Sequence, residues 1–336
     1  MSAATTIDMA LVSRPVQSDP DFRAYLENSL RDPFTINLRG LTLMETIGAC
    51  IRAKSRLMPG YGRSLGGLIH NLGELERQYR VTLQTVQVTD VFWSHFVAFC
   101  MGRGLKASST QTMCTRLRSV LGWAGRYNAI LSPTYRDFRV PRTADNQIAL
   151  TADEVSRVAY FDVQRFYRDR RKDYRDTMER VRDMFVLSCN LYQRHSDMVR
   201  IEPSCFDRNV FTITQQKTGN RAVVNIDQYA IDAKTTYRIL ERYGYRAPYT
   251  ATIGNYNHHL HRLMKDIGFT DAVRVEERRG GRIETADVPK WRLICSHTAR
   301  RTAITVNVLR GHNVHALKRC SGHSDLRTFD SYVRDE

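Results

Sequence analysis

Apolar residues at helical spacing occupy the first third of the chain and constrain its fold more than any other feature. In residues 63–79 the leucines recur at intervals of three and four, as Leu65, Leu68, Leu72 and Leu75. This spacing places them on one face of a helix. Similar patterns occupy residues 41–57, 90–102 and 108–127. Because such faces are buried against one another, we predict a basic bundle of four helices.

The character of the sequence changes after residue 130. Residues 131–148 contain Pro133 and Pro141 and little periodicity, which is typical of an interdomain linker. Thr151 and Glu154 then form a capping-box pattern that begins a new helix. The predicted organisation is a polar leader, disordered in part, over 1–38, a helical domain over 39–130, a linker over 131–148 and a second domain over 149–336.

The second domain is expected to contain one β-hairpin among helices. Residues 209–216 and 221–226 are rich in β-prone side chains, and a turn-like Lys-Thr-Gly-Asn segment connects them. A long apolar helix is expected over 173–192, whereas the charged, Gly-rich segment 276–289 is interpreted as a loop. The predicted fold class is therefore mainly α with a small β-sheet or hairpin, an N-terminal helical bundle being followed by an α+β domain.

Charge narrows the class of partner. The chain has 51 Lys and Arg residues against 35 Asp and Glu, a formal net charge of +16, and the basic residues are dispersed. This distribution favours a broad anionic partner such as nucleic acid, with a merely basic protein as the alternative. No apolar run approaches the roughly 20 residues that span a bilayer, and the start of the chain does not resemble a secretion signal. We expect a soluble, intracellular protein with no membrane partner.

Residues 297–332 contain the closest grouping of side chains suited to catalysis. His297 and Arg300 lie three residues apart, so on a helix they share a face and can address one atom. Arginine offers a rigid fork of donors that fits phosphate oxygens, and histidine can move a proton near neutral pH. His323 and Tyr332 follow within the same stretch. We predict a site that acts on a phosphodiester.

Tyr332 is the candidate nucleophile of this site. A phenol with a pKa near 10 is almost entirely protonated at neutral pH, a deficit of roughly 4 kcal/mol. Neighbouring cations and an imidazole would reduce that deficit, and cations would also stabilise the transition state. In the alternative interpretation, Tyr332 simply packs on a terminal helix beside three apolar residues, Leu326, Phe329 and Val333.

Three polar residues upstream complete the prediction. Arg194 follows an apolar helix and would be a second phosphate-binding cation, although an arginine there can also serve only the helix dipole. Asp197 would support it by holding Arg194 or a histidine in place. Lys217, in the hairpin turn, could protonate the leaving oxygen, which an arginine cannot do. The alternative for Lys217 is a solvated turn lysine.

These residues stand in a recognisable order along the chain. The order is Arg194 with Asp197, Lys217, His297, Arg300, Gly322-His323 and Tyr332. The series resembles the catalytic set of the tyrosine recombinases, the integrases of phages and mobile elements. The same segments are similar to family signatures, namely Gln216-Lys217-Thr218, Ser296-His297-Thr298-Ala299-Arg300-Arg301 and Ser321-Gly322-His323-Ser324. The helical bundle resembles the family's core-binding domain, so the resemblance covers residues 40–336.

The resemblance implies a site-specific DNA recombinase with a two-domain, C-shaped clamp around DNA. Tyr332 would form a 3′-phosphotyrosyl link, and two rounds of exchange would pass through a four-way junction within a tetramer. The other roles it implies are phosphate binding by Arg194, Arg300 and His323, proton movement by His297 and leaving-group protonation by Lys217. The implied substrate is double-stranded DNA with inverted-repeat core sites, with DNA-bending accessory proteins as further partners. The implied setting is the nucleoid of a prokaryotic cytoplasm, and the implied source a phage or mobile element that integrates and excises.

Further basic residues are predicted to contact DNA. They are Lys106, Arg116, Arg118, Arg165, Arg168, Arg170, Arg171 and Arg301. No cofactor is predicted, because the resemblance implies a reaction that needs neither ATP nor metal. His258, His259 and His261 lie in a helix-like segment without cysteine or carboxylate partners, so no zinc site is predicted. Two alternatives stay open: a type IB topoisomerase-like enzyme that reseals the same strand, and a non-catalytic DNA-binding protein with this fold.

Overall fold

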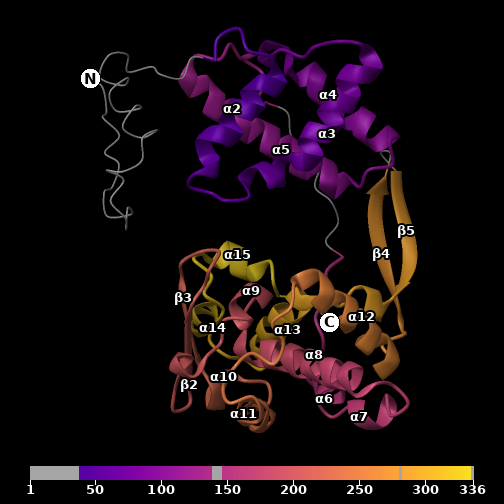
Figure 1. Ribbon diagram of the computed structural model, residues 1–336, viewed down its shortest axis with the longest axis vertical. Helices are drawn as coiled ribbons and strands as arrows, with labels where there is room; N and C mark the ends of the chain where they lie inside the picture. Colours follow the sequence, from indigo (N-terminus) through magenta and orange to yellow (C-terminus); the bar gives the residue numbers. More distant parts are fainter. Residues whose placement is uncertain (1–37, 138–145, 280–281, 334–336) are drawn as a thin grey trace. The chain divides into compact units, whose positions relative to one another are not determined.

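The computed structural model describes residues 38–137, 146–279 and 282–333. Almost all of the predicted leader lies outside the described residues. The chain divides into two compact units, which we call the N-terminal unit (Met1–Ala144 with Glu277–Glu284) and the C-terminal unit (Asp145–Glu276 with Thr285–Glu336). Helices predominate in both, and the sheets are small and antiparallel where their pairing is recorded (Figure 1). The predicted fold class, mainly α with a small sheet, is confirmed.

The N-terminal unit contains the four predicted helices. They are α2 (Leu43–Ser55), α3 (Tyr61–Tyr79), α4 (Asp90–Gly102) and α5 (Ala107–Ala124), with 3-10 turns at Thr85–Gln87 and Gly125–Tyr127. Their apolar faces form one core in which Leu65, Leu68 and Leu72 are fully buried, as the leucine spacing predicts. Leu38 and Tyr135 are also buried in this core, so it reaches into the predicted leader and linker.

The start of α5 differs from the sequence prediction. The helix begins at Ala107, one residue before the predicted position 108, with Lys106 at the N-cap and no side-chain cap. Thr110 is instead buried inside the first turn, where its hydroxyl donates to the carbonyl of Lys106. The capping box of Thr151 and Glu154 is confirmed in the other unit, at the start of α6.

The C-terminal unit is built around one buried helix. Its helices are α6 (Ala152–Ala159), α7 (Val163–Phe166), α8 (Lys172–Leu191), α9 (His195–Met198), α10 (Ile226–Tyr229), α11 (Ala233–Arg242), α12 (Ile253–Ile267), α13 (Ser296–Leu309), α14 (Val314–Ser321) and α15 (Leu326–Asp330). The second half of α8 is buried on all sides, and α6, α11, α12 and α13 pack around it. Because α13 is also almost wholly buried, the segment that begins at His297 is placed in the middle of the unit.

The predicted hairpin forms β2 (Val210–Thr214) and β3 (Arg221–Asn225), and β1 (Phe206–Asp207) adds a third strand that the sequence did not reveal. Phe211 pairs with Val224 and Ile213 with Ala222, which buries one face of the hairpin. The predicted loop over 276–289 is wrong. Strands β4 (Ala272–Arg279) and β5 (Arg282–Pro289) occupy it as a second sheet, because β-prone residues alternate on either side of the two glycines.

Candidate active site

The six predicted catalytic residues come from five places in the C-terminal unit. Arg194 directly precedes α9, and Lys217 lies in the turn between β2 and β3. His297 and Arg300 sit on the first turns of α13. His323 follows the end of α14, and Tyr332 follows α15. Side chains that are up to 138 residues apart in the sequence are therefore brought to one part of the unit.

Tyr332 is directed at His297. Its hydroxyl lies 2.7 Å from Nε2 of His297, at hydrogen-bonding distance. The hydroxyl of Thr305 donates to the carbonyl of Tyr332 over 3.2 Å and so fixes the backbone there. The ring packs against the core near Arg300 and Arg301, whose guanidinium carbons lie 5.5 and 5.7 Å from its centroid. The ring thus packs against the core while the hydroxyl faces His297, and the role of Tyr332 as nucleophile stays a prediction.

Arg300 is fully buried and held by two partners. Its Nη1 donates to the carbonyl of Tyr192 over 3.1 Å, and its Nη2 donates to Nε2 of His323 over 2.9 Å. The hydroxyl of Ser321 donates to the carbonyl of Lys318, so it accepts from Nδ1 of His323, which lies 2.9 Å away. These contacts assign His323 the tautomer with its proton on Nδ1.

His323 contacts Arg300 through the nitrogen that would face a phosphate oxygen in the predicted role. We expected His323 to hold a phosphate oxygen, but its Nε2 carries no proton in this arrangement and accepts from Arg300. Burial, together with the charges of Arg300 and Arg194, lowers the pKa of His323 to about 3. In this arrangement Nε2 of His323 accepts from Arg300, and phosphate binding by His323 stays a prediction.

The site is electrostatically positive. Burial lowers the pKa of His297 from 6.5 to about 4, and the charges of Arg301, Arg300, Arg194 and Lys217 lower it further in the same direction. The imidazole is thus neutral at pH 7 and able to accept a proton. Burial and the charge of Arg194 also lower the pKa of Arg300 to about 9, which leaves the guanidinium protonated. Several cations converging without an equal number of carboxylates are suited to an anionic substrate.

Arg194 has a neutral partner. Its Nη1 donates over 2.8 Å to Oε1 of Gln215, and within the described part of the chain no carboxylate forms an ion pair with it. An amide fixes the guanidinium without neutralising it, so the charge of Arg194 remains available to a bound anion.

Asp197 contacts other groups than those predicted. We expected it to hold Arg194 or a histidine, but its buried Oδ1 accepts from the backbone N–H of Gln216 over 2.8 Å. It therefore anchors the residue that precedes Lys217. Its charge also favours the protonated form of Arg300, against the larger effect of burial on the pKa of that residue. Lys217 itself is exposed on the turn.

The residues predicted to contact DNA occupy very different positions. Arg301 is buried and donates to the carbonyl of Ile148, and Arg116 donates from α5 to the carbonyl of Ser64. Both arginines connect elements of their own units. Lys106 is exposed and Arg118 half-buried on α5. The structure therefore gives Arg301 and Arg116 internal partners that the sequence did not reveal.

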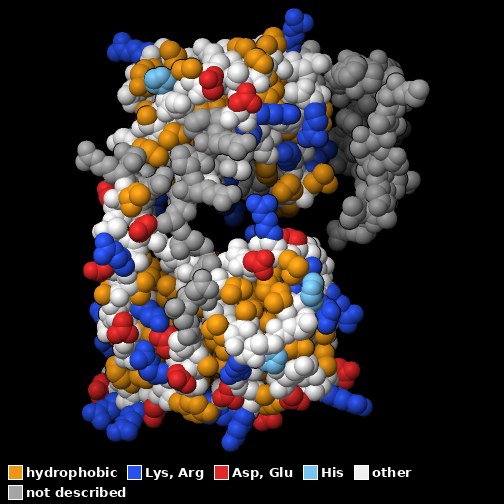
Figure 2. All heavy atoms as spheres, turned by 180° about the vertical axis from the view of Figure 1, so that it is seen from behind, with side chains coloured by type: hydrophobic (Ala, Val, Ile, Leu, Met, Phe, Trp, Pro, Cys, Tyr) orange, Lys and Arg blue, Asp and Glu red, His pale blue; other side chains and the backbone are white. Residues whose placement is uncertain are grey.

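The basic run Arg165–Arg171 lies in and directly after α7. Arg165, Arg168, Arg170 and Arg171 are exposed in and after α7, at the end of the C-terminal unit opposite α9 and α15 (Figure 1). Figure 2 shows Lys and Arg side chains gathered at this end. The contacts of Tyr332 given above involve none of these four arginines.

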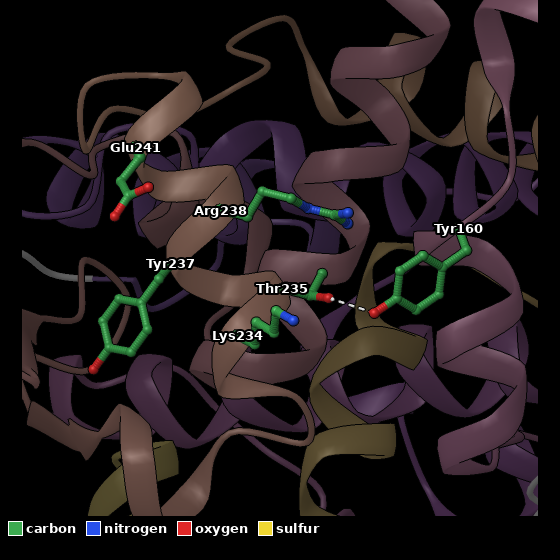
Figure 3. Close-up of a pocket in the computed structure, with 6 residues that line it drawn as sticks. All are labelled: Tyr160, Lys234, Thr235, Tyr237, Arg238 and Glu241. Atoms are coloured by element: carbon green, nitrogen blue, oxygen red, sulfur yellow. Dashed lines mark hydrogen bonds between the residues drawn. The ribbon is translucent and has the colours of Figure 1, made fainter.

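The described residues include no group of three His, Cys, Asp or Glu side chains that could hold a metal ion, and no described helix is long and apolar enough to cross a membrane. A pocket away from the candidate site is lined by Tyr160, Lys234, Thr235, Tyr237, Arg238 and Glu241 (Figure 3). In it the hydroxyls of Tyr160 and Thr235 lie 3.3 Å apart. None of the predicted catalytic residues lines it.

Sequence reasoning missed two buried glutamines at the site, Gln193 and Gln215. A signal for Gln215 was present, because Phe211 and Ile213 alternate with polar residues along β2 and the next residue on their face is Gln215. A glutamine on the buried face of a strand needs polar partners, which marks it as part of a network. For Gln193 the sequence offers no comparable signal.

No family model matches the sequence, and no curated protein matches it. Solved structures do. A lambda integrase dimer bound to a COC′ core site is 15% identical, with 88% of this chain and 96% of that chain covered and a TM-score of 0.61. The Tn1549 transposon integrase in complex with transposon right end DNA is 15% identical over 88% and 96%, with a TM-score of 0.62. A lambda integrase tetramer bound to a Holliday junction is 15% identical over 94% and 86%, with a TM-score of 0.56. The chain has the tyrosine recombinase fold.

Proposed function

We propose that this protein is a site-specific DNA recombinase that cuts and rejoins strands through a 3′-phosphotyrosyl intermediate. One observation carries the proposal, the 2.7 Å contact between Nε2 of His297 and the hydroxyl of Tyr332 inside a cluster of cations. A phenol needs a proton acceptor and positive charge in order to attack phosphorus. Both lie around this hydroxyl.

In the first step the oxygen of Tyr332 forms a bond to phosphorus while its proton passes to Nε2 of His297. Neutral His297 has a free lone pair at pH 7, because its pKa of about 4 keeps the imidazole unprotonated. The negative charge of a bound phosphate opposes the cations that lower this pKa, which makes the imidazole more basic when substrate arrives. Arg300 and Arg194 then face the non-bridging oxygens, where charge develops.

The bond from phosphorus to the 5′-oxygen breaks as the new bond forms. That oxygen leaves as a hydroxyl if Lys217 supplies a proton. Lys217 is exposed on a turn whose first residues are fixed by Asp197 and Gln215, so an exposed side chain extends from a fixed backbone. Rejoining is the reverse reaction, with a 5′-hydroxyl attacking the phosphotyrosine. The phosphodiester energy is kept in the covalent link, so the exchange needs no nucleotide cofactor.

The solved relatives support duplex DNA as substrate and an oligomer as the active species. The lambda integrase structures hold a dimer bound to a core site and a tetramer bound to a Holliday junction. By analogy, we propose that this chain closes its two units around double-stranded DNA at inverted-repeat core sites and exchanges strands as a tetramer through a four-way junction. Integration or excision of a mobile element is the process that such exchange would serve.

A nicked duplex that loses its 5′-terminal fragment on cleavage tests the proposal, because it traps the covalent product. We expect protein attached to the 3′ end of the cut strand, with yield unchanged by EDTA. With two intact sites, we expect recombinant joints. Relaxed plasmid without joints would identify a topoisomerase-like enzyme, and tight binding without attachment a non-catalytic DNA-binding protein.

A further inference from the structure

Two buried glutamines, Gln193 and Gln215, contact three elements of the candidate site. These elements are the end of α8, the turn between β2 and β3 and the end of α14. Gln215 is 1% exposed and Gln193 is fully buried. Neither can reach bulk solvent, and a buried amide without partners is costly, so their contacts define their role.

The carboxamide of Gln215 makes four hydrogen bonds. Its Oε1 accepts from Nη1 of Arg194 over 2.8 Å and from the hydroxyl of Thr218 over 3.0 Å. Its Nε2 donates to Oε1 of Gln193 over 2.9 Å and to the carbonyl of Ser321 over 2.8 Å. Arginine only donates and a carbonyl only accepts, so the orientation of the amide is determined. No other side chain of this length both donates twice and accepts twice.

Each of these bonds reaches a different part of the site. Arg194 is a phosphate-binding candidate, Thr218 lies next to Lys217 on the turn, and Ser321 begins the turn that carries His323. Gln193 extends the network, because its Nε2 donates to the carbonyls of Leu191 and Cys320. The end of α8, the hairpin turn and the end of α14 are therefore joined through two amides.

Gly322 shows how closely these elements approach. A Cβ on this residue would lie 2.7 Å from Nε2 and 2.8 Å from Cδ of Gln215, and its backbone has a φ of +65°. The adjacent Asn220 also donates from the hairpin to the carbonyl of Gly322 over 3.1 Å. Only glycine allows both the close contact and the left-handed backbone without strain.

We infer that Gln215, supported by Gln193, is a positioning residue. It holds Arg194, the Lys217 turn and the His323 turn in fixed relative positions for phosphoryl transfer. The inference rests on the proposed function and goes beyond it, since Gln215 touches no reacting atom. A neutral amide suits this role because a carboxylate in its place would pair with Arg194 and compete with phosphate. Misplacement of catalytic groups by about 1 Å costs on the order of 100-fold in rate.

The test measures cleavage of the nicked duplex by Gln215→Met and Gln215→Glu, with Gln216→Met as the matched control. Gln216 is the same residue type one position along the chain, but its side chain is exposed. We expect both Gln215 variants to lose about 100-fold in cleavage rate with DNA affinity within a few-fold of wild type. A Gln215→Met rate within twofold of Gln216→Met would overturn the inference.

A second substrate separates positioning from folding. When sulfur replaces the 5′-bridging oxygen of the duplex, the leaving group departs without a proton donor. The part of the rate loss that comes from a displaced Lys217 should then disappear. We expect the cleavage rate of Gln215→Met to fall less on the sulfur-containing duplex than on the ordinary duplex. A partly unfolded protein would lose the same rate on both. An equal loss on both would overturn the link to Lys217.

Coupling between the glutamines is tested by Gln193→Met and by the double variant. If the two amides act as one network, the double variant should lose no more than the more impaired single variant. A loss equal to the product of the two single effects would contradict the network. If wild type and Gln216→Met both yield no covalent product, the proposed function is wrong. If both are active and Gln215→Met cleaves normally, only the positioning role is wrong.

Discussion

Nε2 of His297 lies 2.7 Å from the hydroxyl of Tyr332, although 35 residues separate them in the chain. The first turn of α13 thus presents a neutral imidazole to the phenol that follows α15, and no folding of the active site around substrate is needed to bring them together. We propose a separate role for each residue, with His297 as proton acceptor and Tyr332 as nucleophile, and each role can be tested.

Replacement of His297 should slow the covalent step without preventing DNA binding. We expect His297→Ala to lower the rate of attachment to the nicked duplex by about 10²–10⁴-fold, the usual contribution of a positioned general base. The remaining rate should rise with pH, since solvent must take the proton. Rates from pH 6 to 9 check this, with His258→Ala as control because His258 is exposed on α12. A wild-type rate for His297→Ala would remove the residue from the mechanism.

The proton donor is tested by changing the leaving atom. Lys217→Ala should be severely impaired on ordinary DNA and regain most of its cleavage on 5′-bridging sulfur, which leaves readily without a proton. Lys234→Ala, at an exposed lysine on α11, should cleave both substrates like wild type. Lack of recovery on sulfur would move the proton donor to another residue.

The low pKa of His297 also predicts how stability depends on pH. Its pKa is about 4 in the folded protein against 6.5 ordinarily, so unfolding is accompanied by proton uptake between these values. This contribution is fully present above pH 6.5 and is lost as the pH falls towards 4. Between pH 6.5 and 4, the Tm of wild type should therefore fall more steeply than that of His297→Gln. Parallel curves would show that His297 is not held neutral by the fold.

The substitutions Arg301→Gln and Arg168→Gln should differ in their effect on the free energy of unfolding. Arg301 is 3% exposed and donates to the carbonyl of Ile148, so Arg301→Gln should reduce the free energy of unfolding by about 1–3 kcal/mol. Arg168 is exposed beyond α7, and Arg168→Gln should stay within about 0.5 kcal/mol of wild type. Urea unfolding measures both, and an unaltered stability for Arg301→Gln would contradict its internal role.

Local patterns predicted the helices well and the polar contacts poorly. The leucines of α3 and the capping box of α6 are signals within a few residues, and both were confirmed. The two glycines near residue 280 suggested a loop, and the alternation of Val273 and Val275 on one side with Ile283 and Thr285 on the other was the better guide to β4 and β5.

The residues of the candidate site could be predicted by type and order, but their hydrogen-bond partners could not. Nothing near Arg301 in the sequence tells whether the residue after Arg300 faces solvent or the core, because that depends on what packs against the far side of α13. The contact of Gln193 with Cys320 joins residues 127 positions apart. Such partners are determined by tertiary packing, and no local periodicity carries them.

Identification of the residue that carries the DNA tests the central claim most directly. After reaction with the nicked duplex and digestion, mass spectrometry should find the 3′-phosphate on the peptide that contains Tyr332, and Tyr332→Phe should bind the duplex with unchanged affinity but form no covalent product. Attachment to any other residue, or covalent product from Tyr332→Phe, would contradict the account.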